Sequence, residues 1–423
     1  MIKFLLTGLL RDRQRSVVPI IIVALGVMLT IVFQSWILGI ISDSIEYNAR
    51  FTTGHVKIMT SAYADNINQM PNDLSLNGTD SLLQSLEKQF PDLEWVERIH
   101  FAGLVDVPDS SGETSSQGPA IGFGMDLLSG NNSEVNRMNI SKALRKGRLP
   151  EKEGEILLSN AFCEKLKLKP GDPLSLISTT MYGEMAIYNF ILAGTAEFGT
   201  TALDRGTIFA DIRDVRKALN MENSTGEILG YFRTGYYDDD LANPVVKEFN
   251  RQFNVPTDEF SPVMMSLKEQ GSMRVFVDFA SMLMAIVIFV FIFAMSIVLW
   301  NAGLLGGLRR YGEFGMRLAI GEEKNHVYKT ILIESLGIGI IGSVIGTLIG
   351  MGFAWYLQDY GIDIGMMKNA TIMMPTVFRG RITIETWYIG FIPGVVSTVI
   401  GTALSGIGIY KRQTAQLFKE LGS

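Results

Sequence analysis

The sequence has a single cysteine, Cys163, among its 423 residues. One cysteine cannot form an internal disulfide, so cysteine usage does not reveal the redox compartment. Histidine is also sparse: His55, His100 and His326 are the whole set, and no two of them have the H-x-x-x-H spacing. Histidine pairs and cysteine clusters are the usual ligands of zinc, so the sequence indicates no metal site. We expect no metal and no cofactor in this chain.

The sequence also lacks the motifs of common catalytic and nucleotide-binding sites. It contains no G-x-x-x-x-G-K-(S/T) loop, so this chain is not expected to cradle the phosphates of ATP. It has no Ser-His-Asp order, no carboxylate pair inside an apolar run and no cysteine-histidine cluster. Gly337, Gly339 and Gly342 fit a dinucleotide fingerprint, but they lie within an apolar run without a preceding soluble strand. We therefore predict no catalytic residues.

Long apolar runs are abundant instead. Hydrophobic residues make up 47% of the chain and charged residues 19%, which indicates a partly membrane-embedded protein, and the net charge of −6 argues against nucleic-acid binding. Four windows can cross a hydrocarbon core of about 30 Å, which takes about 20 helical residues. They are Val17–Ile41, Val275–Trp300, Thr330–Leu357 and Trp387–Tyr410. The first is too long for a signal peptide and lacks a cleavage site, so we expect it to remain as an anchor.

Basic residues predict how these spans are oriented. They precede the first span at Lys3, Arg11, Arg13 and Arg15, and follow the last at Lys411, Arg412 and Lys419. Because cations favour the cytoplasmic side, both termini are expected there, with an interfacial helix over residues 1–16 and a tail over residues 411–423. Residues 42–272 are then expected to be translocated as one domain. Residues 358–386 would form a short outer loop, where Arg379 and Arg381 run against the charge rule.

The predicted translocated segment alternates helical and strand-like pieces. Helices are expected at Asp80–Phe90 and Asp211–Leu219, and strands at Trp95–Val107, Ala120–Gly124, Tyr188–Gly194 and Thr207–Ala210. Residues 147–178 read as strand, helix, a turn at Pro170-Gly171-Asp172 and another strand. The predicted fold is therefore four transmembrane helices with a large α+β domain inserted between the first and the second.

Residues 301–329 form a charged elbow between the second and third spans. The elbow carries Arg309, Arg310, Arg317, Lys324 and Lys329 against Glu313, Glu322 and Glu323, which predicts a cytoplasmic location. Within it, Leu308, Tyr311, Phe314 and Leu318 recur at three- and four-residue steps and share one face of a short helix. Periodicity alone fits equally well a helix that docks in a groove of a partner and one that lies on lipid headgroups.

Small residues line two of the predicted spans. Gly342, Gly346 and Gly350 form one stripe on the third span, and Gly390, Gly394, Thr398 and Thr402 form another on the fourth. Small residues let helices in a membrane approach closely. We predict that the third and fourth spans pack together.

The elbow also carries a family resemblance. The string RRYGEFGMRLAIGEEKNHVYKTILIESLGIGIIG resembles the segment after the second span of type VII ABC transporter permeases. This group contains the lipoprotein-releasing permeases LolC and LolE, the MacB efflux permeases and the division protein FtsX. In that family the segment is the coupling helix that touches the ATPase. The resemblance assigns ATPase coupling to Arg310, Glu313, Phe314, Gly315, Arg317 and Gly321.

Two further stretches resemble the same family. Gly54-His55-Val56-Lys57-Ile58 is similar to the G-H-(V/I/L)-x-I strand that opens the periplasmic domain of lipoprotein-releasing permeases. Glu153-Gly154-Glu155, Leu166, Leu168, Gly171 and Asp172 match a second stretch of that domain. The resemblance implies a MacB-like periplasmic core. The closing GIYKRQTAQLFKEL resembles the family's tail but lacks both of its prolines, so a continuous helix is allowed there.

The resemblance implies a bacterial inner-membrane permease that works with a separate ATPase, which binds ATP and magnesium. Further implied partners are a second permease copy or a paralogue, membrane lipid and a periplasmic lipoprotein carrier. The implied function is extraction of lipoproteins or similar acylated substrates, and the alternatives are MacB-like efflux and FtsX-like signalling to a cell-wall hydrolase. In lipoprotein-releasing permeases the first two spans border a lateral cavity, and the corresponding residues here are Trp36, Ile40, Ile41, Val275, Phe276, Phe279 and Leu283.

Overall fold

The computed structural model describes residues 13–109, 111–130, 133–198, 201–308, 311–363 and 377–407. The chain divides into two compact units. The first, called the helical unit, comprises residues 1–43, 279–364 and 377–423; the second, called the α+β unit, comprises residues 44–278 and 365–376. Of the predicted interfacial helix only residues 13–16 are described, as the start of a long helix, and the predicted tail over 411–423 lies outside the described residues.

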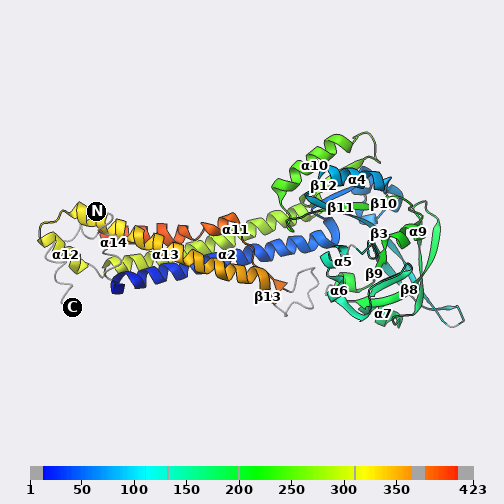
Figure 1. Cartoon of the computed structure of the whole chain (residues 1–423), viewed down its shortest axis with the longest axis horizontal. Coiled ribbons are helices and arrows are strands. Elements are labelled where there is room, and N and C mark those ends of the chain that lie inside the picture. The colour runs from blue at the N-terminus through cyan, green and yellow to red at the C-terminus, as the bar shows by residue number, and fades with distance from the viewer. Residues whose placement is uncertain are drawn as a thin grey trace. The chain divides into compact units, whose positions relative to one another are not determined.

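Among the described residues, four helical segments are long and apolar enough to cross a membrane (Figure 1). Their elements are α2 (Arg13–Asn48), α11 (Met273–Leu308), α13 (Lys324–Tyr360) and, for the fourth, η6 (Ile384–Trp387), η7 (Ile392–Ser397) and α14 (Thr398–Gly406). The short helix α12 (Tyr311–Ala319) lies in the elbow between α11 and α13. Pro393 has no N–H to donate, and it lies in η7, a stretch of π-helix.

The core of the helical unit is built on one face of α2. Val23, Val27 and Ile31 recur at four-residue steps on that face and are buried with Leu299 of α11. Ile338, Met351 and Ile389 pack against this cluster from the other two spans. The first span is therefore the central helix of the described bundle.

The α+β unit holds a sheet of ten described strands in the order β12-β1-β11-β3-β4-β9-β6-β8-β5, with β7 paired to β3 and β8. The strands are β1 (Val56–Thr60), β3 (Leu93–Pro108), β4 (Thr114–Met125), β5 (Leu144–Gly147), β6 (Glu155–Ser159), β7 (Pro173–Thr179), β8 (Met185–Ala196), β9 (Thr207–Asp211), β11 (Glu227–Phe232) and β12 (Pro262–Ser266). A two-residue ladder joins β2 (Leu76–Asn77) to β10 (Ser224–Thr225). Pairing is antiparallel except for β4 with β9 and β6 with β8.

Helices cover this sheet. The longer ones are α4 (Thr79–Gln89), α7 (Asn160–Leu166), α9 (Ile212–Leu219) and α10 (Asp239–Phe253), and the shorter ones are α3 (Ser61–Asp65), α5 (Ser133–Arg137), α6 (Ile140–Ala143) and α8 (Thr201–Asp204). Asp211 caps α9 by accepting from the N–H of Arg213 at 3.1 Å, as its position after a strand favours. The helices and strands predicted for this segment with stated bounds are confirmed within three residues of their ends, except that β4 begins six residues earlier than predicted.

Candidate functional site

The elbow of the helical unit ends in a defined turn. Gly321 has φ of +100°, a conformation that only glycine adopts without strain. Its N–H donates to Leu318 O at 3.1 Å, while the N–H of Glu322 donates to Arg317 O at 3.1 Å. This pair of bonds is the Schellman arrangement that closes a helix, so Gly321 ends α12 and sets the direction of the chain into α13.

The structure gives the predicted coupling residues different environments. The side chains of Glu313 and Arg317 are half-buried, and Gly315 is buried. Arg310 and the side chain of Phe314 lie outside the described parts of the chain. Two apolar side chains of the elbow are exposed instead, Met316 at 50% and Ile320 at 82%. The amphipathic pattern singled out neither, because both lie off the face formed by Phe314 and Leu318.

The glycine stripe of α13 faces α2. A Cβ on Gly342 would lie 2.7 Å from Val23 Cβ, and one on Gly346 would lie 2.5 Å from the carbonyl oxygen of Ala24. On Gly350 it would approach Ile31 Cβ to 3.1 Å. The stripe therefore lets the backbone of α13 approach the large residues of α2.

The glycines of the fourth span lie between two helices. A Cβ on Gly390 would lie 2.6 Å from Val27 of α2, and one on Gly394 would overlap the hydroxyl of Ser343 on α13. Gly339 of α13 in turn faces the carbonyl oxygen of Gly394 at 3.1 Å. The third and fourth spans thus do contact each other, through Gly339 and Ser343, while Gly342, Gly346 and Gly350 contact the first span.

The residues predicted to border a lateral cavity are divided between the units. In the helical unit, Trp36, Ile40 and Ile41 are half-buried on α2, whereas Phe279 and Leu283 of α11 are 63% and 49% exposed. The first turn of α11 belongs to the α+β unit, and in it Val275 is 72% exposed and Phe276 is 37% exposed.

The exposure of α11 extends along the whole span. Only 6% of its most apolar stretch is buried, against 39% for α2 and α13 and 50% for the fourth span. A helix that is apolar all round needs an apolar surrounding, which is lipid, cargo or another helix.

A surface segment that the sequence did not indicate lies against α2. It comprises residues 377–383, and its first two residues form β14 (Val377–Phe378), which pairs with β13 (Ile362–Asp363). The Arg381 guanidinium donates to Ser42 Oγ at 2.9 Å, and Arg379 N donates to Asp43 Oδ2 at 3.2 Å. These two arginines, which run against the charge rule if this loop is the outer one predicted, are therefore held by contacts to α2.

The α+β unit has an exposed apolar row across four strands. Strand register aligns Pro119 of β4, Leu104 of β3, Ile177 of β7 and Ile187 of β8. Pro119 and Ile187 are exposed and the other two are half-buried. Alternation along β7 and β8 puts the large core residues on the opposite face, so this row is a surface without a partner in the described chain.

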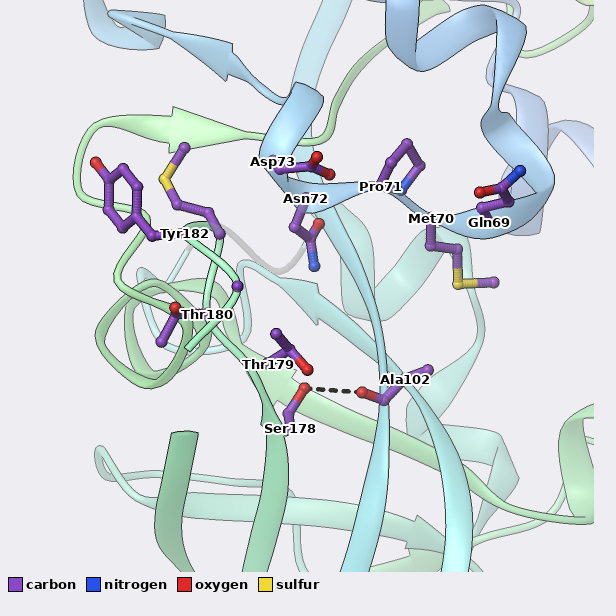
Figure 2. A pocket seen from close by; sticks show the side chains of 12 residues that line it. Gln69, Met70, Pro71, Asn72, Asp73, Ala102, Ser178, Thr179, Thr180 and Tyr182 are labelled. Carbon is purple, nitrogen blue, oxygen red and sulfur yellow. Dashed lines mark hydrogen bonds between the residues drawn. The ribbon is translucent and has the colours of Figure 1, made fainter. Parts of the chain in front are cut away.

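A pocket of about 400 Å³ opens near one end of this row (Figure 2). Its walls come from the segment Gln69–Asp73 and from the turn between β7 and β8, which includes Thr180 and Tyr182. Ser178 Oγ donates to the carbonyl oxygen of Ala102 at 2.8 Å at its floor. The lining presents hydroxyls, amides and the carboxyl group of Asp73, which can form hydrogen bonds.

The buried charges of the α+β unit are paired within the fold. Lys57 Nζ lies 2.8 Å from Glu227 Oε2, and His100 lies 3.4 Å from the same oxygen. Burial alone would raise the pKa of the Glu227 carboxyl, but the interactions with Lys57 and His100 outweigh it and hold the pKa at about 2. Burial raises the pKa of the Cys163 thiol to about 12, which makes it a poor nucleophile. Among the described residues, no group of three His, Cys, Asp or Glu side chains could hold a metal ion.

Comparisons with known proteins agree with the resemblance of the elbow. A family model described as FtsX-like permease C-terminal matches residues 285–414. The chain is 24% identical over 261 residues to the lipoprotein-releasing system transmembrane protein LolC of Xylella fastidiosa strain Temecula1, across 58% of this chain and 60% of that protein. LolC of Xylella fastidiosa strain 9a5c is 24% identical over 253 residues, which cover 56% of this chain and 58% of that protein. The chain thus matches about 60% of the length of these relatives.

Among solved structures, the periplasmic region of MacB from Actinobacillus actinomycetemcomitans aligns with a TM-score of 0.34 and 11% identity, across 51% of this chain and 90% of that chain. The family model covers α12 and α13 entirely and most of α11, so it spans the elbow whose geometry is described above. Residues 285–414 are thus similar to FtsX-like permeases, and the curated proteins that the chain resembles are LolC permeases.

Proposed function

We propose that this chain is the permease subunit of an ABC transporter that extracts lipoproteins or similar acylated substrates from the bacterial inner membrane. A separate ATPase subunit binds ATP and magnesium and supplies the energy. The LolC proteins among its relatives are named for a lipoprotein-releasing system, which supports this substrate class. Both termini and the elbow face the cytoplasm, and the α+β unit faces the periplasm.

The observation that carries the proposal is the exposed surface of α11. Phe279, Met282 and Leu283 are 63%, 62% and 49% exposed at the end of the helical unit where α11 leads into the α+β unit. Phenylalanine, methionine and leucine side chains adapt to flexible chains without fixed polar geometry. A surface of this kind can hold an acyl chain.

Two partner surfaces follow from the exposed groups. Met316 and Ile320 on the elbow, together with Phe314, provide the apolar contacts to the ATPase, with Glu313 and Arg317 at the rim. On the other side of the membrane, the apolar row through Leu104, Ile177 and Ile187 is the surface for a periplasmic lipoprotein carrier.

We further propose that two permeases, either identical or paralogous, assemble with two ATPases. Four spans are few for a translocation route, and the exposed apolar surface of α11 can pack against a helix of a second permease. A purified complex whose mass equals one permease and one ATPase would contradict this assembly.

The function is tested with the permease and its ATPase in proteoliposomes that also carry a triacylated lipoprotein. Release of the lipoprotein to a soluble carrier should require ATP. The same protein without its acyl chains is the control, because the proposal requires the chains for transport. Equal ATP-dependent movement of the acylated and unacylated forms would replace this proposal with efflux of periplasmic solutes.

A further inference from the structure

His55 links three parts of the α+β unit. Its side chain is completely buried. Nδ1 accepts from the N–H of Phe232 at 2.9 Å, so the ring proton is on Nε2, which donates to Glu46 Oε2 at 2.8 Å. Its backbone N–H donates to Gly230 O, and its carbonyl accepts from Leu267, each at 2.9 Å. One residue thus joins the end of α2, strand β11 and the segment that leads into α11.

The chain just before His55 has a conformation that needs this support. After α2, the π-helix η1 (Ala49–Thr53) ends at Gly54, whose φ of +60° and ψ of −177° belong to a region that only glycine occupies readily. A Cβ on Gly54 would also lie 2.8 Å from Val56 O. Gly54 and His55 are therefore required by the same turn, for different reasons.

Side chains from the sheet and from the start of α11 hold the carbonyl groups of η1. Tyr231 donates to Ala49 O at 3.1 Å, Arg98 donates to Phe51 O at 3.2 Å, and Gln270 donates to Thr53 O at 3.1 Å. Each donor is buried or belongs to the sheet that surrounds His55. Because these bonds reach alternate residues along the whole of η1, the turn cannot rotate without breaking several of them.

The first turn of α11 meets the same place. Ala49, Leu267 and Val277 are buried together, and Ile45 and Met273 pack on them. Lys268 bridges the starts of two helices, at 3.1 Å from Asp239 of α10 and 2.8 Å from Asp278 of α11. The last turns of α2 and the first turn of α11 are thus fixed to one another inside the α+β unit.

We propose that this junction, centred on Gly54 and His55, is the rigid joint that makes the α+β unit move with the first two spans. Both helices continue from the joint into the helical unit, so a displacement of either one reaches the sheet through it. His55 is a positioning residue: it touches no cargo, and it transmits movement by holding Glu46 of α2 to β11. This inference rests on the proposed function, because it assigns the route by which ATPase movement reaches the periplasmic side.

The two nitrogens of His55 can be tested separately. Asparagine places an amide oxygen near Nδ1, so His55→Asn keeps the bond from Phe232 and loses the one to Glu46. Glutamine places an amide nitrogen near Nε2, so His55→Gln keeps the bond to Glu46. Glu46→Gln keeps an acceptor for Nε2–H, whereas Glu46→Leu removes it. Arg50→Ala is the matched control, since it removes the other partner of Glu46, at 3.4 Å, and leaves His55 untouched.

The experiment uses the full complex with its ATPase and a fluorophore on Val255→Cys, after Cys163→Ser makes that label unique. Val255 is 52% exposed in the α+β unit and lies outside the apolar row proposed for the carrier. The readouts are ATP hydrolysis, the ATP-dependent change in fluorescence, and lipoprotein release per ATP, all normalised to folded complex. In His55→Asn and Glu46→Leu, the rate of ATP hydrolysis should stay within about twofold of the parent. Lipoprotein release per ATP should fall about tenfold, and the ATP-dependent fluorescence change should be lost. His55→Gln, Glu46→Gln and Arg50→Ala should stay close to the parent.

The inference is overturned if His55→Asn and Glu46→Leu keep both the fluorescence change and the release per ATP. It is also overturned if their losses only follow the amount of folded complex, since that is what a purely structural residue would show. A parent complex that changes fluorescence with ATP but releases no lipoprotein contradicts the proposed function, and the same variants still test the joint through the fluorescence change.

Discussion

Ser35 and Arg381, which lie 346 positions apart in the sequence, exchange two hydrogen bonds. Arg381 N donates to the carbonyl oxygen of Ser35 at 2.9 Å, and Ser35 Oγ donates to the carbonyl oxygen of Arg381 at 3.1 Å. One turn further along α2, a Cβ on Gly39 would overlap the carbonyl oxygen of Arg379. The segment 377–383, which follows from β14, therefore lies directly on the backbone of α2, within the helical unit.

This contact predicts that Gly39 tolerates no side chain. Gly39→Ala should push this segment off α2 and destabilise the helical unit by about 1–3 kcal/mol, because the clash is with backbone that cannot rotate away. Thermal unfolding in detergent measures the change. Arg379→Ala is the control, since its side chain is exposed and its backbone bond to Asp43 remains. Equal unfolding temperatures for Gly39→Ala and the parent would show that the segment does not press on α2.

A second prediction separates two glycines of the same helix. Gly346→Ala should destabilise the packing of α13 on α2 by about 1–3 kcal/mol, since its Cβ would lie 2.5 Å from Ala24 O. Gly352 has nothing within 4 Å of a built Cβ, so Gly352→Ala should be neutral or stabilise by about 0.5–1 kcal/mol. Thermal unfolding of the two variants side by side gives the comparison. The same response from both would mean that Gly346 does not set the approach of the helices.

A third prediction concerns assembly with the ATPase. Phe314→Ala and Ile320→Ser should each weaken binding of the ATPase by about 1–3 kcal/mol, because apolar anchors dominate such interfaces. Glu313→Lys should instead leave the complex assembled and uncouple ATP hydrolysis from transport, since rim charges contribute less to affinity. Ile384→Ser is the control for exposure, because Ile384 is 83% exposed but lies outside the elbow, against 82% for Ile320. Unchanged binding, hydrolysis and transport in all the elbow variants would reject the elbow as the coupling element.

A fourth prediction is the acid sensitivity of the α+β unit. The pKa of Glu227 is about 2 in the folded protein against an ordinary value of 4.5. A depressed pKa stabilises the fold above pH 4.5, and this stability of about 2–4 kcal/mol is lost as the pH falls from 4.5 to 2. Urea unfolding followed by circular dichroism should show that loss. Glu227→Gln should be less stable at pH 7, because Lys57 loses its charged partner. The free energy of unfolding of this variant should also depend less on pH below pH 4.5. The same pH dependence in the variant and the parent would contradict the assignment of this stability to Glu227.

Much of the fold was predictable because its signals are local. The apolar windows are long, and strands such as Trp95–Val107 alternate in the expected way, so β3 was located within two residues of its ends. Asp211 follows a strand and precedes an amphipathic stretch, which marks a cap. Turn residues such as Gly171, with φ of +100°, also act through the local backbone. Each of these features is written within a few consecutive residues.

The partners of the glycine stripes were not predictable, because a stripe shows a small face but not the helix that fills it. Gly342, Gly346 and Gly350 contact α2, since Val23, Val27 and Ile31 supply the matching ridge of large side chains. The role of His55 was hidden for a related reason. Gly230, Phe232 and Leu267 come from distant parts of the chain, and they bind His55 through backbone groups that leave no trace in residue identity.

The central claim is that acylated cargo enters along the exposed surface of α11, and photo-crosslinking tests it most directly. Crosslinkers are placed at Ile40 and Phe279, and at Leu348, which is 64% exposed on α13, as the control for general lipid exposure. A labelled lipoprotein in the reconstituted complex should crosslink at Ile40 and Phe279 without ATP hydrolysis, lose those crosslinks when ATP is added, and show few at Leu348. Crosslinks confined to residues 60–262, with none at Ile40 or Phe279, would contradict the account and favour a soluble cargo.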